Sequence, residues 1–190
     1  MATKISVIIP TYAPKDYLWE CLGSLENQTL SKDEFEVILV LNGEREPYES
    51  LIQKKLPEYS FNSTLLYSTP NGVSRARNLG MEKAQGCHIC FIDDDDWVSD
   101  NYLEDLLSKA CDNGIVEANV KDVDEVTREE SEQHFLSRAY KNYQPEKESS
   151  LFVNRSFFSS ACCKLLPKNC INGQRFDTNI KRGEDSIFMY

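Results

Sequence analysis

The sequence contains no apolar run that approaches the roughly 20 residues required for a helix to cross a bilayer. Its opening residues, MATKISVIIP, lead directly into a predicted strand and hold no apolar stretch long enough for a secretory signal peptide. We therefore expect a cytoplasmic chain without a transmembrane segment, for which peripheral attachment at the inner face of the membrane stays open.

Basic residues are in the minority, with 21 Lys and Arg against 31 Asp and Glu and a formal net charge of -10. A general nucleic-acid-binding protein normally presents a basic face, so we expect no nucleic-acid partner. The charge balance still allows a local basic pocket for phosphate groups.

Seven cysteines are present, an odd number in a chain without a signal peptide, which favours reduced thiols over a disulfide framework. Cys87 and Cys90 match the C-x-x-C pattern, but on a strand their side chains point to opposite faces. No second pair follows at zinc spacing, so buried structural cysteines are favoured over a metal or redox site. His88 and His134 lack a ligand partner at useful spacing.

Strand and helix patterns alternate four times over the first 110 residues. Apolar runs predict strands at residues 5–9, 35–41, 65–67 and 87–92. Helical periodicity follows each of them, most clearly in the windows 18–25, 73–85 and 103–110. With 190 residues and 41% hydrophobic content, the chain suffices for one α/β domain around a mostly parallel sheet.

The later part of the chain has a looser pattern. Residues 121–134 are highly charged and are interpreted as a solvated loop or helix face, and residues 140–150 as a mobile loop. Apolar segments at 151–158 and 161–166 predict that order resumes there. Because a helical pattern has only just begun at the last residue, Tyr190, we expect the natural chain to continue beyond it.

The segment FIDDDDWVSD places four carboxylates, residues 93–96, directly after a buried strand. Two such charges about 4 Å apart repel by roughly 4 kcal/mol at an effective dielectric near 20, so a cation is needed nearby. A hard divalent metal with oxygen ligands is the natural candidate, and a solvated acidic turn is the alternative. Thr11 and Asn42 also follow predicted strands, and parallel strands end at the same sheet edge, where ligands bind.

Four segments in order carry a family resemblance: SVIIPTYAPKDYLWECLGSLENQT, NGVSRARNLGMEKAQG, FIDDDDW and GEDSIF. Together they resemble the family-2 glycosyltransferases of the GT-A fold. The resemblance covers nearly all 190 residues and implies a single domain with a Rossmann-like sheet. Residues 1–112 would then be the nucleotide-sugar-binding half, and 113–190 the looser acceptor-side half, truncated at its C-terminus.

The resemblance also implies roles for individual residues. Asp93, Asp94 and Asp95 stand at the family's D-x-D position, where Asp95 and Asp93 would hold Mn²⁺ or Mg²⁺. Glu184 and Asp185 match the catalytic ED motif, in which the Asp is the general base, although acids also favour a helix start. The implied donor-binding residues are Pro10, Thr11, Tyr12, Asn42, Arg77, Asn78, Asp93 and Asp94.

One departure concerns nucleotide recognition. The second strand of this family usually ends in Asp-Asp-Gly-Ser, whose first Asp helps to hold the nucleotide, whereas Leu41-Asn42-Gly43-Glu44 stands here. Asn42 can still hydrogen-bond a base, but Leu41 cannot. A UDP-sugar is the favoured donor, with weaker support than metal binding has.

The implied function is a metal-dependent, inverting transfer of a sugar from a nucleotide-diphosphate donor to a hydroxyl of a saccharide or lipid-linked acceptor. It would serve surface polysaccharide or glycan synthesis, and a homo-oligomer is compatible with it. A nucleotide hydrolase is rejected because the G-x-x-x-x-G-K-[ST] loop is missing. A nucleotidyltransferase usually has a Gly-rich basic loop where PTYAPKD stands, and a non-catalytic or truncated nucleotide-sugar-binding module remains the main alternative.

Overall fold

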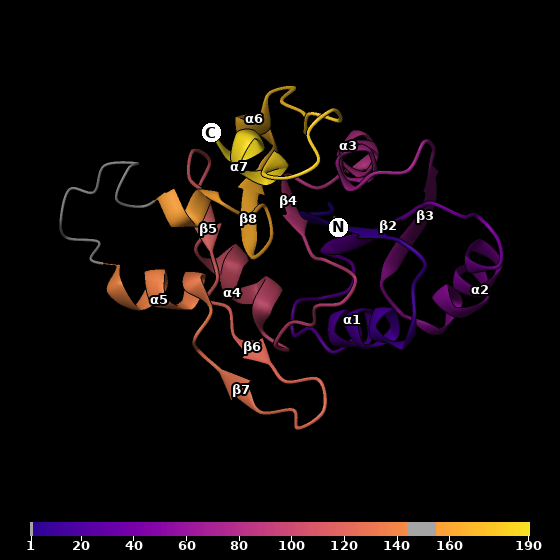
Figure 1. Cartoon of the computed structure of the whole chain (residues 1–190), viewed down its shortest axis with the longest axis horizontal. Coiled ribbons are helices and arrows are strands. Elements are labelled where there is room, and N and C mark those ends of the chain that lie inside the picture. Colours follow the sequence, from indigo (N-terminus) through magenta and orange to yellow (C-terminus); the bar gives the residue numbers. More distant parts are fainter. Residues whose placement is uncertain (1, 144–154) are drawn as a thin grey trace.

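One six-stranded sheet with helices on both faces forms the body of the molecule (Figure 1). The computed structural model describes residues 2–143 and 155–190. The strands are β1 Ile5–Thr11, β2 Phe35–Asn42, β3 Asn62–Ser68, β4 His88–Phe91, β5 Val116–Glu117, β6 Asp122–Val123, β7 Glu130–Ser131 and β8 Lys164–Pro167. The helices are α1 Asp16–Glu26, α2 Tyr48–Lys55, α3 Val73–Lys83, α4 Tyr102–Ser108, α5 Phe135–Asn142, α6 Lys168–Ile171 and α7 Glu184–Met189, with 3-10 turns η1 Leu56–Glu58 and η2 Arg155–Phe158.

The strand order is β3-β2-β1-β4-β8-β5, and the first four of these strands run parallel. β8 is antiparallel to both of its neighbours, β4 and β5. Every residue of β1 and β2 is buried, as expected for central strands covered on both faces, which is why they read as continuous apolar runs. The prediction of an α/β fold with a mostly parallel sheet is confirmed.

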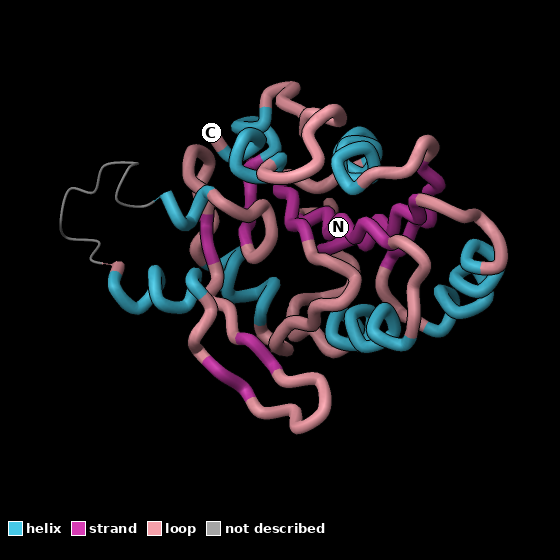
Figure 2. The backbone as a smooth tube through the Cα atoms, viewed as in Figure 1, coloured by secondary structure: helices cyan, strands magenta, loops and turns pink. Residues whose placement is uncertain are grey.

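Two layers of helices enclose the sheet, one with α1, α2 and α4 and the other with α3, α6 and α7 (Figures 1 and 2). The α1 layer buries Leu18, Cys21, Leu22 and Leu25, which are the four positions that the helical period predicted. Their partners on β1 are Ile5, Val7 and Ile9, whereas Ile8 faces the α3 layer. The alternation of side chains along β1 therefore supplies both halves of the core.

The end of the sheet where β1 begins carries a buried polar connection that the sequence did not indicate. The Ser6 hydroxyl donates to Glu36 Oε1 at 2.6 Å, and the backbone N–H of Gln85 donates to the same oxygen at 2.7 Å. The Gly86 N–H in turn donates to Ser6 Oγ at 2.8 Å. These bonds tie β1 and β2 to the turn that leads into the start of β4.

The charged segment 121–134 differs from its prediction. It forms a short antiparallel pair, β6 and β7, closed by a turn in which Asp124 Oδ1 accepts from the N–H groups of Val126 and Thr127. Its side chains are largely exposed, so the prediction of a solvated segment is confirmed. The prediction of a loop or helix for its backbone is wrong at the two short strands. Of residues 140–150, which were predicted to be a loop, the first three belong to α5 and Tyr143 is its C-cap, so the prediction is wrong there. Those from 144 onward lie outside the described residues.

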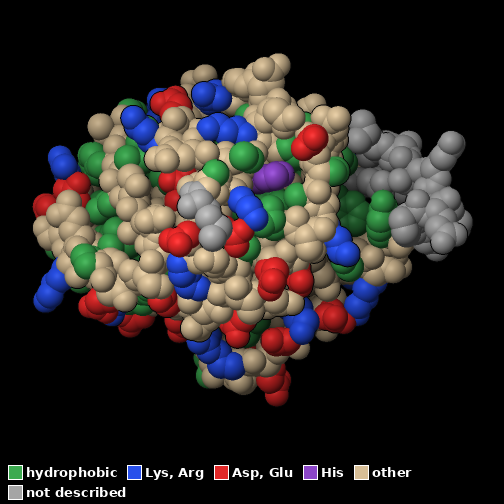
Figure 3. All heavy atoms as spheres, turned by 180° about the vertical axis from the view of Figure 1, so that it is seen from behind, with side chains coloured by type: hydrophobic (Ala, Val, Ile, Leu, Met, Phe, Trp, Pro, Cys, Tyr) green, Lys and Arg blue, Asp and Glu red, His purple; other side chains and the backbone are tan. Residues whose placement is uncertain are grey.

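Acidic and basic side chains are interspersed on the face shown in Figure 3, and the described residues form no broad basic area there. None of the helices that the structure describes is both long and apolar enough to traverse a lipid bilayer. All seven cysteines are free thiols, as predicted.

Helix α3 lies close to the sheet through the small buried residues Ala76 and Gly80 and through its C-cap residue, Ala84. A Cβ atom added at Gly80 would stand 2.4 Å from Ile8 Cγ2, well inside van der Waals contact. Ile8 is fully buried and β-branched, so its side chain has little freedom to move away. Close contact at this point holds α3, and the residues it carries, against β1.

We expect Gly80→Ala to destabilise the fold, because overpacking against Ile8 outweighs the gain in helix propensity by about 1–2 kcal/mol. Gly23→Ala in α1 is the matched control, since a Cβ there meets nothing within 4 Å and the change should be neutral or stabilising. Urea unfolding of both variants measures the difference. Equal stability of the two would contradict the close approach of α3.

Candidate active site

Three polar strand ends meet at the carboxyl edge of the sheet, as predicted. The Thr11 hydroxyl at the end of β1 donates to Asp94 Oδ2 at 2.5 Å, just beyond β4. The Asn42 side chain at the end of β2 donates to the Thr11 carbonyl oxygen at 2.8 Å and accepts from the Gly72 N–H at 3.2 Å. Asn42 thereby joins two strands to the start of α3, and both ends of its amide are in use.

Tyr12 is the most exposed of the predicted donor-binding residues, with 57% of its surface accessible. Its ring lies against Gly43, where an added Cβ would come within 2.5 Å of Tyr12 Cε2 and where φ is +113°. A larger residue at position 43 would displace the ring. Pro10 is buried within β1. Donor contacts of Pro10, Thr11, Tyr12 and Asn42 stay predictions.

The four carboxylates after β4 occupy different environments. Asp93 and Asp94 are half-buried, whereas Asp95 and Asp96 are exposed. Burial raises the pKa of Asp94 to about 6, with repulsion from Asp95 and Asp93 adding to the rise and the Thr11 hydroxyl opposing it. The cluster is therefore the costly accumulation of negative charge that the sequence indicated.

Asp95 is the member of this cluster best suited to a metal. Its carboxylate has no hydrogen-bond or ion-pair partner in residues 2–143 and 155–190, so it is available to a cation. Within the same residues, no three His, Cys, Asp or Glu side chains are grouped as ligands of one ion. One or two carboxylates of this cluster would suit Mg²⁺ or Mn²⁺, whose remaining ligands would be phosphate oxygens of the donor and waters.

The loop that carries the acids is fastened to the end of α1. Gln28 is buried, and its side chain donates to the carbonyl oxygens of Ser24 and Ser99 at 3.0 and 2.7 Å. Its Oε1 accepts from the Leu103 N–H at 2.8 Å, and Ser24 Oγ accepts from the Val98 N–H at 3.1 Å. No sequence pattern had singled out Gln28 or Ser24, because their partners in the acid loop and at α4 lie more than 70 residues away along the chain.

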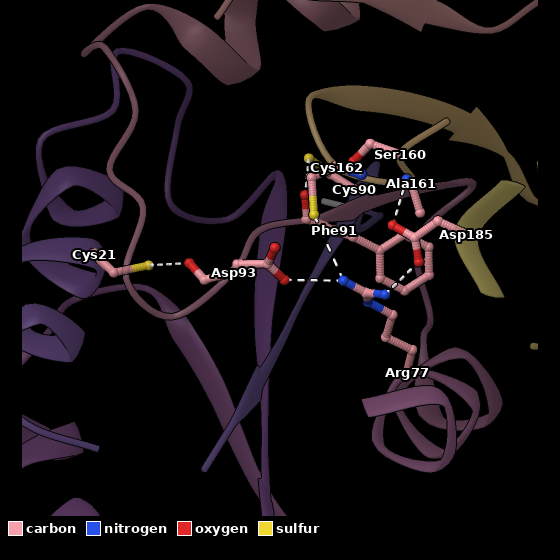
Figure 4. A network of polar contacts seen from close by, with 9 residues as sticks. All are labelled: Cys21, Arg77, Cys90, Phe91, Asp93, Ser160, Ala161, Cys162 and Asp185. Carbon is pink, nitrogen blue, oxygen red and sulfur yellow. Dashed lines mark hydrogen bonds and ion pairs between the residues drawn. The ribbon is translucent and has the colours of Figure 1, made fainter. Parts of the chain in front are cut away.

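Arg77 on α3 joins the two motifs that carry the predicted chemistry (Figure 4). Its side chain is only 4% exposed, and Nη2 pairs with Asp93 Oδ1 at 2.9 Å while Nη1 pairs with Asp185 Oδ1 at 2.6 Å. The guanidinium lies 5.9 Å from the ring centre of Phe91 and 5.4 Å from that of Phe176. The D-x-D and ED segments, far apart in sequence, therefore share one buried cation.

Asp185 is held on both carboxylate oxygens. Oδ1 accepts from Arg77, and Oδ2 accepts from the backbone N–H of Ala161 at 3.0 Å. The residue stands in the first turn of α7, directly after Glu184, and Gly183 with φ +79° allows the chain to turn into that helix. The predicted base is thus oriented by α3 on one side and by the segment before β8 on the other.

Asn78, the neighbour of Arg77, makes reciprocal hydrogen bonds with the backbone of Phe176. Its Nδ2 donates to the Phe176 carbonyl oxygen and its Oδ1 accepts from the Phe176 N–H, both at 2.9 Å. This clamp seats Phe176 over Arg77, a function that the sequence did not indicate. A direct contact of Asn78 with the donor stays a prediction.

An exposed aromatic residue, Trp97, follows the four carboxylates directly in the acid loop. Trp97 is 43% exposed, and the Arg128 guanidinium from the β6–β7 hairpin lies 5.0 Å from its ring centre. Arg128 also pairs with Glu20 of α1 at 2.7 Å. The hairpin therefore reaches back to the half of the chain that carries the acids.

Two characterised proteins resemble this chain in sequence. The minor teichoic acid biosynthesis protein GgaB of Bacillus subtilis is 28% identical over 190 residues, which cover 95% of this chain and 20% of GgaB. The poly(ribitol-phosphate) beta-N-acetylglucosaminyltransferase TarS of Staphylococcus aureus is 31% identical over 105 residues, which cover 55% of this chain and 18% of TarS. The chain thus spans about a fifth of the length of these relatives.

Solved structures confirm the GT-A type of fold. S. aureus TarS 1-349 in complex with UDP is 25% identical with a TM-score of 0.76, over 98% of this chain and 54% of that one. The same protein in complex with UDP-GlcNAc also gives 0.76 at 25% identity, over 98% and 52%. The mannosyltransferase PcManGT of Pyrobaculum calidifontis, in complex with GDP-Man and Mn²⁺, matches in fold alone, at 17% identity and a TM-score of 0.72 over 99% and 51%.

The family model described as glycosyl transferase family 2 matches residues 6–168, which is most of the chain. The likeness to TarS in both sequence and fold agrees with this match. So does the meeting of the polar strand ends at one edge of the sheet. The chain belongs to glycosyl transferase family 2.

Proposed function

We propose that this chain is the transferase domain of a metal-dependent, inverting glycosyltransferase. The observation that carries the proposal is the shared ion pair of Arg77 with Asp93 and Asp185. It brings a carboxylate of the metal-binding motif and the candidate base to opposite sides of one side chain. A donor and an acceptor bound at these two carboxylates would meet in a single site.

The donor half of the site would be residues 1–112. Asp95, with Asp93, would hold Mn²⁺ or Mg²⁺, which would neutralise charge on the departing nucleoside diphosphate. The half-buried Asp94, fixed by the Thr11 hydroxyl, is placed to accept hydrogen bonds from ribose or sugar hydroxyls. Tyr12 presents an exposed ring at the same edge for a nucleobase to lie against.

The acceptor half would be residues 113–190, with Asp185 as the general base. Asp185 would take the proton from the acceptor hydroxyl as that oxygen attacks the anomeric carbon. The bond to the nucleoside diphosphate breaks on the opposite side of the carbon, and its electrons leave with the diphosphate, so the configuration inverts. Glu184, in the same helical turn, would help to bind the acceptor.

The relatives support a choice of donor and of acceptor class. TarS structures in complex with UDP and UDP-GlcNAc support a UDP-sugar, although Leu41 in this chain lacks a polar group for the nucleotide. The relatives named for teichoic acid and poly(ribitol-phosphate) synthesis support a saccharide or lipid-linked acceptor of the cell surface. Action from the cytoplasmic side would give the enzyme access to nucleotide sugars.

Thermal unfolding with UDP or GDP, each with and without Mn²⁺, tests donor binding. We expect one nucleotide to raise the unfolding temperature only when Mn²⁺ is present, because a ligand at about 100 times its Kd stabilises the native state by roughly 2.7 kcal/mol. Asp95→Asn should lose this shift and the Mn²⁺-dependent turnover, and should keep the unfolding temperature of the free protein.

Asp100→Asn is the control for that variant, because Asp100 is exposed in the same loop and has no assigned function. A full Mn²⁺-dependent shift in Asp95→Asn would remove Asp95 from the metal site.

The affinity for Mn²⁺ should depend on pH between 5 and 7.5. The pKa of Asp94 is raised to about 6, so lowering the pH through 6 adds a proton and removes a negative charge beside the metal. We therefore expect the Kd for Mn²⁺, measured by electron paramagnetic resonance, to rise severalfold as the pH falls from 7.5 to 5.5. Burial also raises the pKa of Asp96 to about 6, so Asp94→Asn should reduce that dependence and leave the part that Asp96 contributes. An unchanged slope would assign the titration to Asp96.

Asp185→Asn should lower kcat by a factor on the order of 10²–10⁴, because the acceptor hydroxyl loses its general base. Asp177→Asn serves as the control, since Asp177 is exposed and its carboxylate hydrogen-bonds only Asn179 among the described residues. Initial rates with a radiolabelled UDP-sugar measure both. Nucleotide binding without any transfer by the unaltered protein would favour a non-catalytic donor-binding module instead.

A further inference from the structure

The Arg77 guanidinium is buried, with only 4% of the side chain exposed. Nη1 and Nη2 are both paired with carboxylates, and Nη2 also lies 3.8 Å from Cys162 Sγ. The third nitrogen, Nε, is buried and has no partner among the described residues. Because the side chain is only 4% exposed and two of its nitrogens are paired with carboxylates, the guanidinium presents almost no surface to a donor phosphate.

The surroundings of Arg77 fix its plane. Phe91 at the end of β4 and Phe176 both lie within 6 Å of the guanidinium carbon, and their rings meet edge to face with centres 5.4 Å apart. The Asn78 clamp on the Phe176 backbone keeps the second ring in place. A planar fork held in this way sets the direction of two carboxylates at once, which a lysine ammonium does not do.

We infer that Arg77 is a positioning residue that sets the place of Asp185 relative to Asp93, and that it is not a ligand of the donor phosphates. The inference rests on the proposed function, because Asp185 must act as the base for its position to matter. Ala161 supplies the second support through its N–H, so the loss of Arg77 would leave Asp185 held on one oxygen only.

Arg77→Lys is the test variant, since it keeps the charge and loses the fork. We expect kcat to fall at least about tenfold while the Kd for the UDP-sugar with Mn²⁺ stays within about threefold. In an Asp185→Asn background, the same change should lower the residual single-turnover rate less than twofold, because the residue through which Arg77 acts is already lost.

Arg75→Lys is the matched control on the same helix, because the Arg75 side chain has no hydrogen-bond or ion-pair partner in the part of the chain described. We expect it to keep the wild-type kcat and donor Kd. An equal loss from Arg77→Lys in both backgrounds, or a weaker donor Kd with unchanged kcat, would overturn the inference.

Phe176→Leu is a second test variant, to be used if Arg77→Lys does not fold. It removes one aromatic face beside the guanidinium and keeps an apolar side chain in the core, so a smaller fall in kcat that vanishes with Asp185→Asn is expected. A fall in both backgrounds would overturn the positioning role. If Asp185→Asn alone leaves the rate of transfer unchanged, Asp185 is not the base and the proposed function fails. That result differs from one in which Asp185→Asn and Arg77→Lys each lower the rate independently, which contradicts only the positioning role of Arg77.

Discussion

Burying one guanidinium beside two aromatic rings is the constraint on which the site depends. A buried cation is tolerated only when it is paired, and Arg77 is paired with carboxylates from two distant segments. The pairing also lowers the cost of Asp93, which would otherwise add to the charge of the acid cluster. Fold stability and site geometry are thus coupled through the same atoms.

The sheet brings these segments together from both of its ends. At one end, Glu36 and Ser6 tie β1 and β2 to the turn before β4. At the other, Gln28 fastens the loop after β4 to the end of α1. The short strand β4 is therefore restrained on both sides, so Phe91 and Asp93 stand at defined places beside α3.

The local patterns were sufficient to predict the first half of the fold. The four parallel strands and the buried face of α1 follow from apolar runs and helical spacing, which depend on neighbours in the chain. The antiparallel insertion of β8 between β4 and β5 was not predicted, because two- and four-residue strands carry too little pattern. The β6–β7 pair was missed since its charged residues match no strand alternation.

Prediction of the site was limited in the same way. Motif resemblance selected Arg77, Asp93 and Asp185 but could not assign the partners of Arg77, since those lie 16 and 108 residues away. Phe176 and the Ala161 N–H had no signal at all, because a packing ring and a backbone group belong to no motif. Contacts between segments that are distant in the chain could not be predicted from the sequence alone.

The β6–β7 hairpin contacts α1 and the acid loop through exposed side chains, because Arg128 stacks on Trp97 and pairs with Glu20. Contacts of this kind are individually weak and are screened by salt, so the hairpin can open locally without unfolding the sheet. Changes of length at its tip cost little loop entropy and disturb no buried strand. In evolutionary terms, the hairpin is a place where this family member can accept insertions and diverge while the sheet and its buried arginine stay the same.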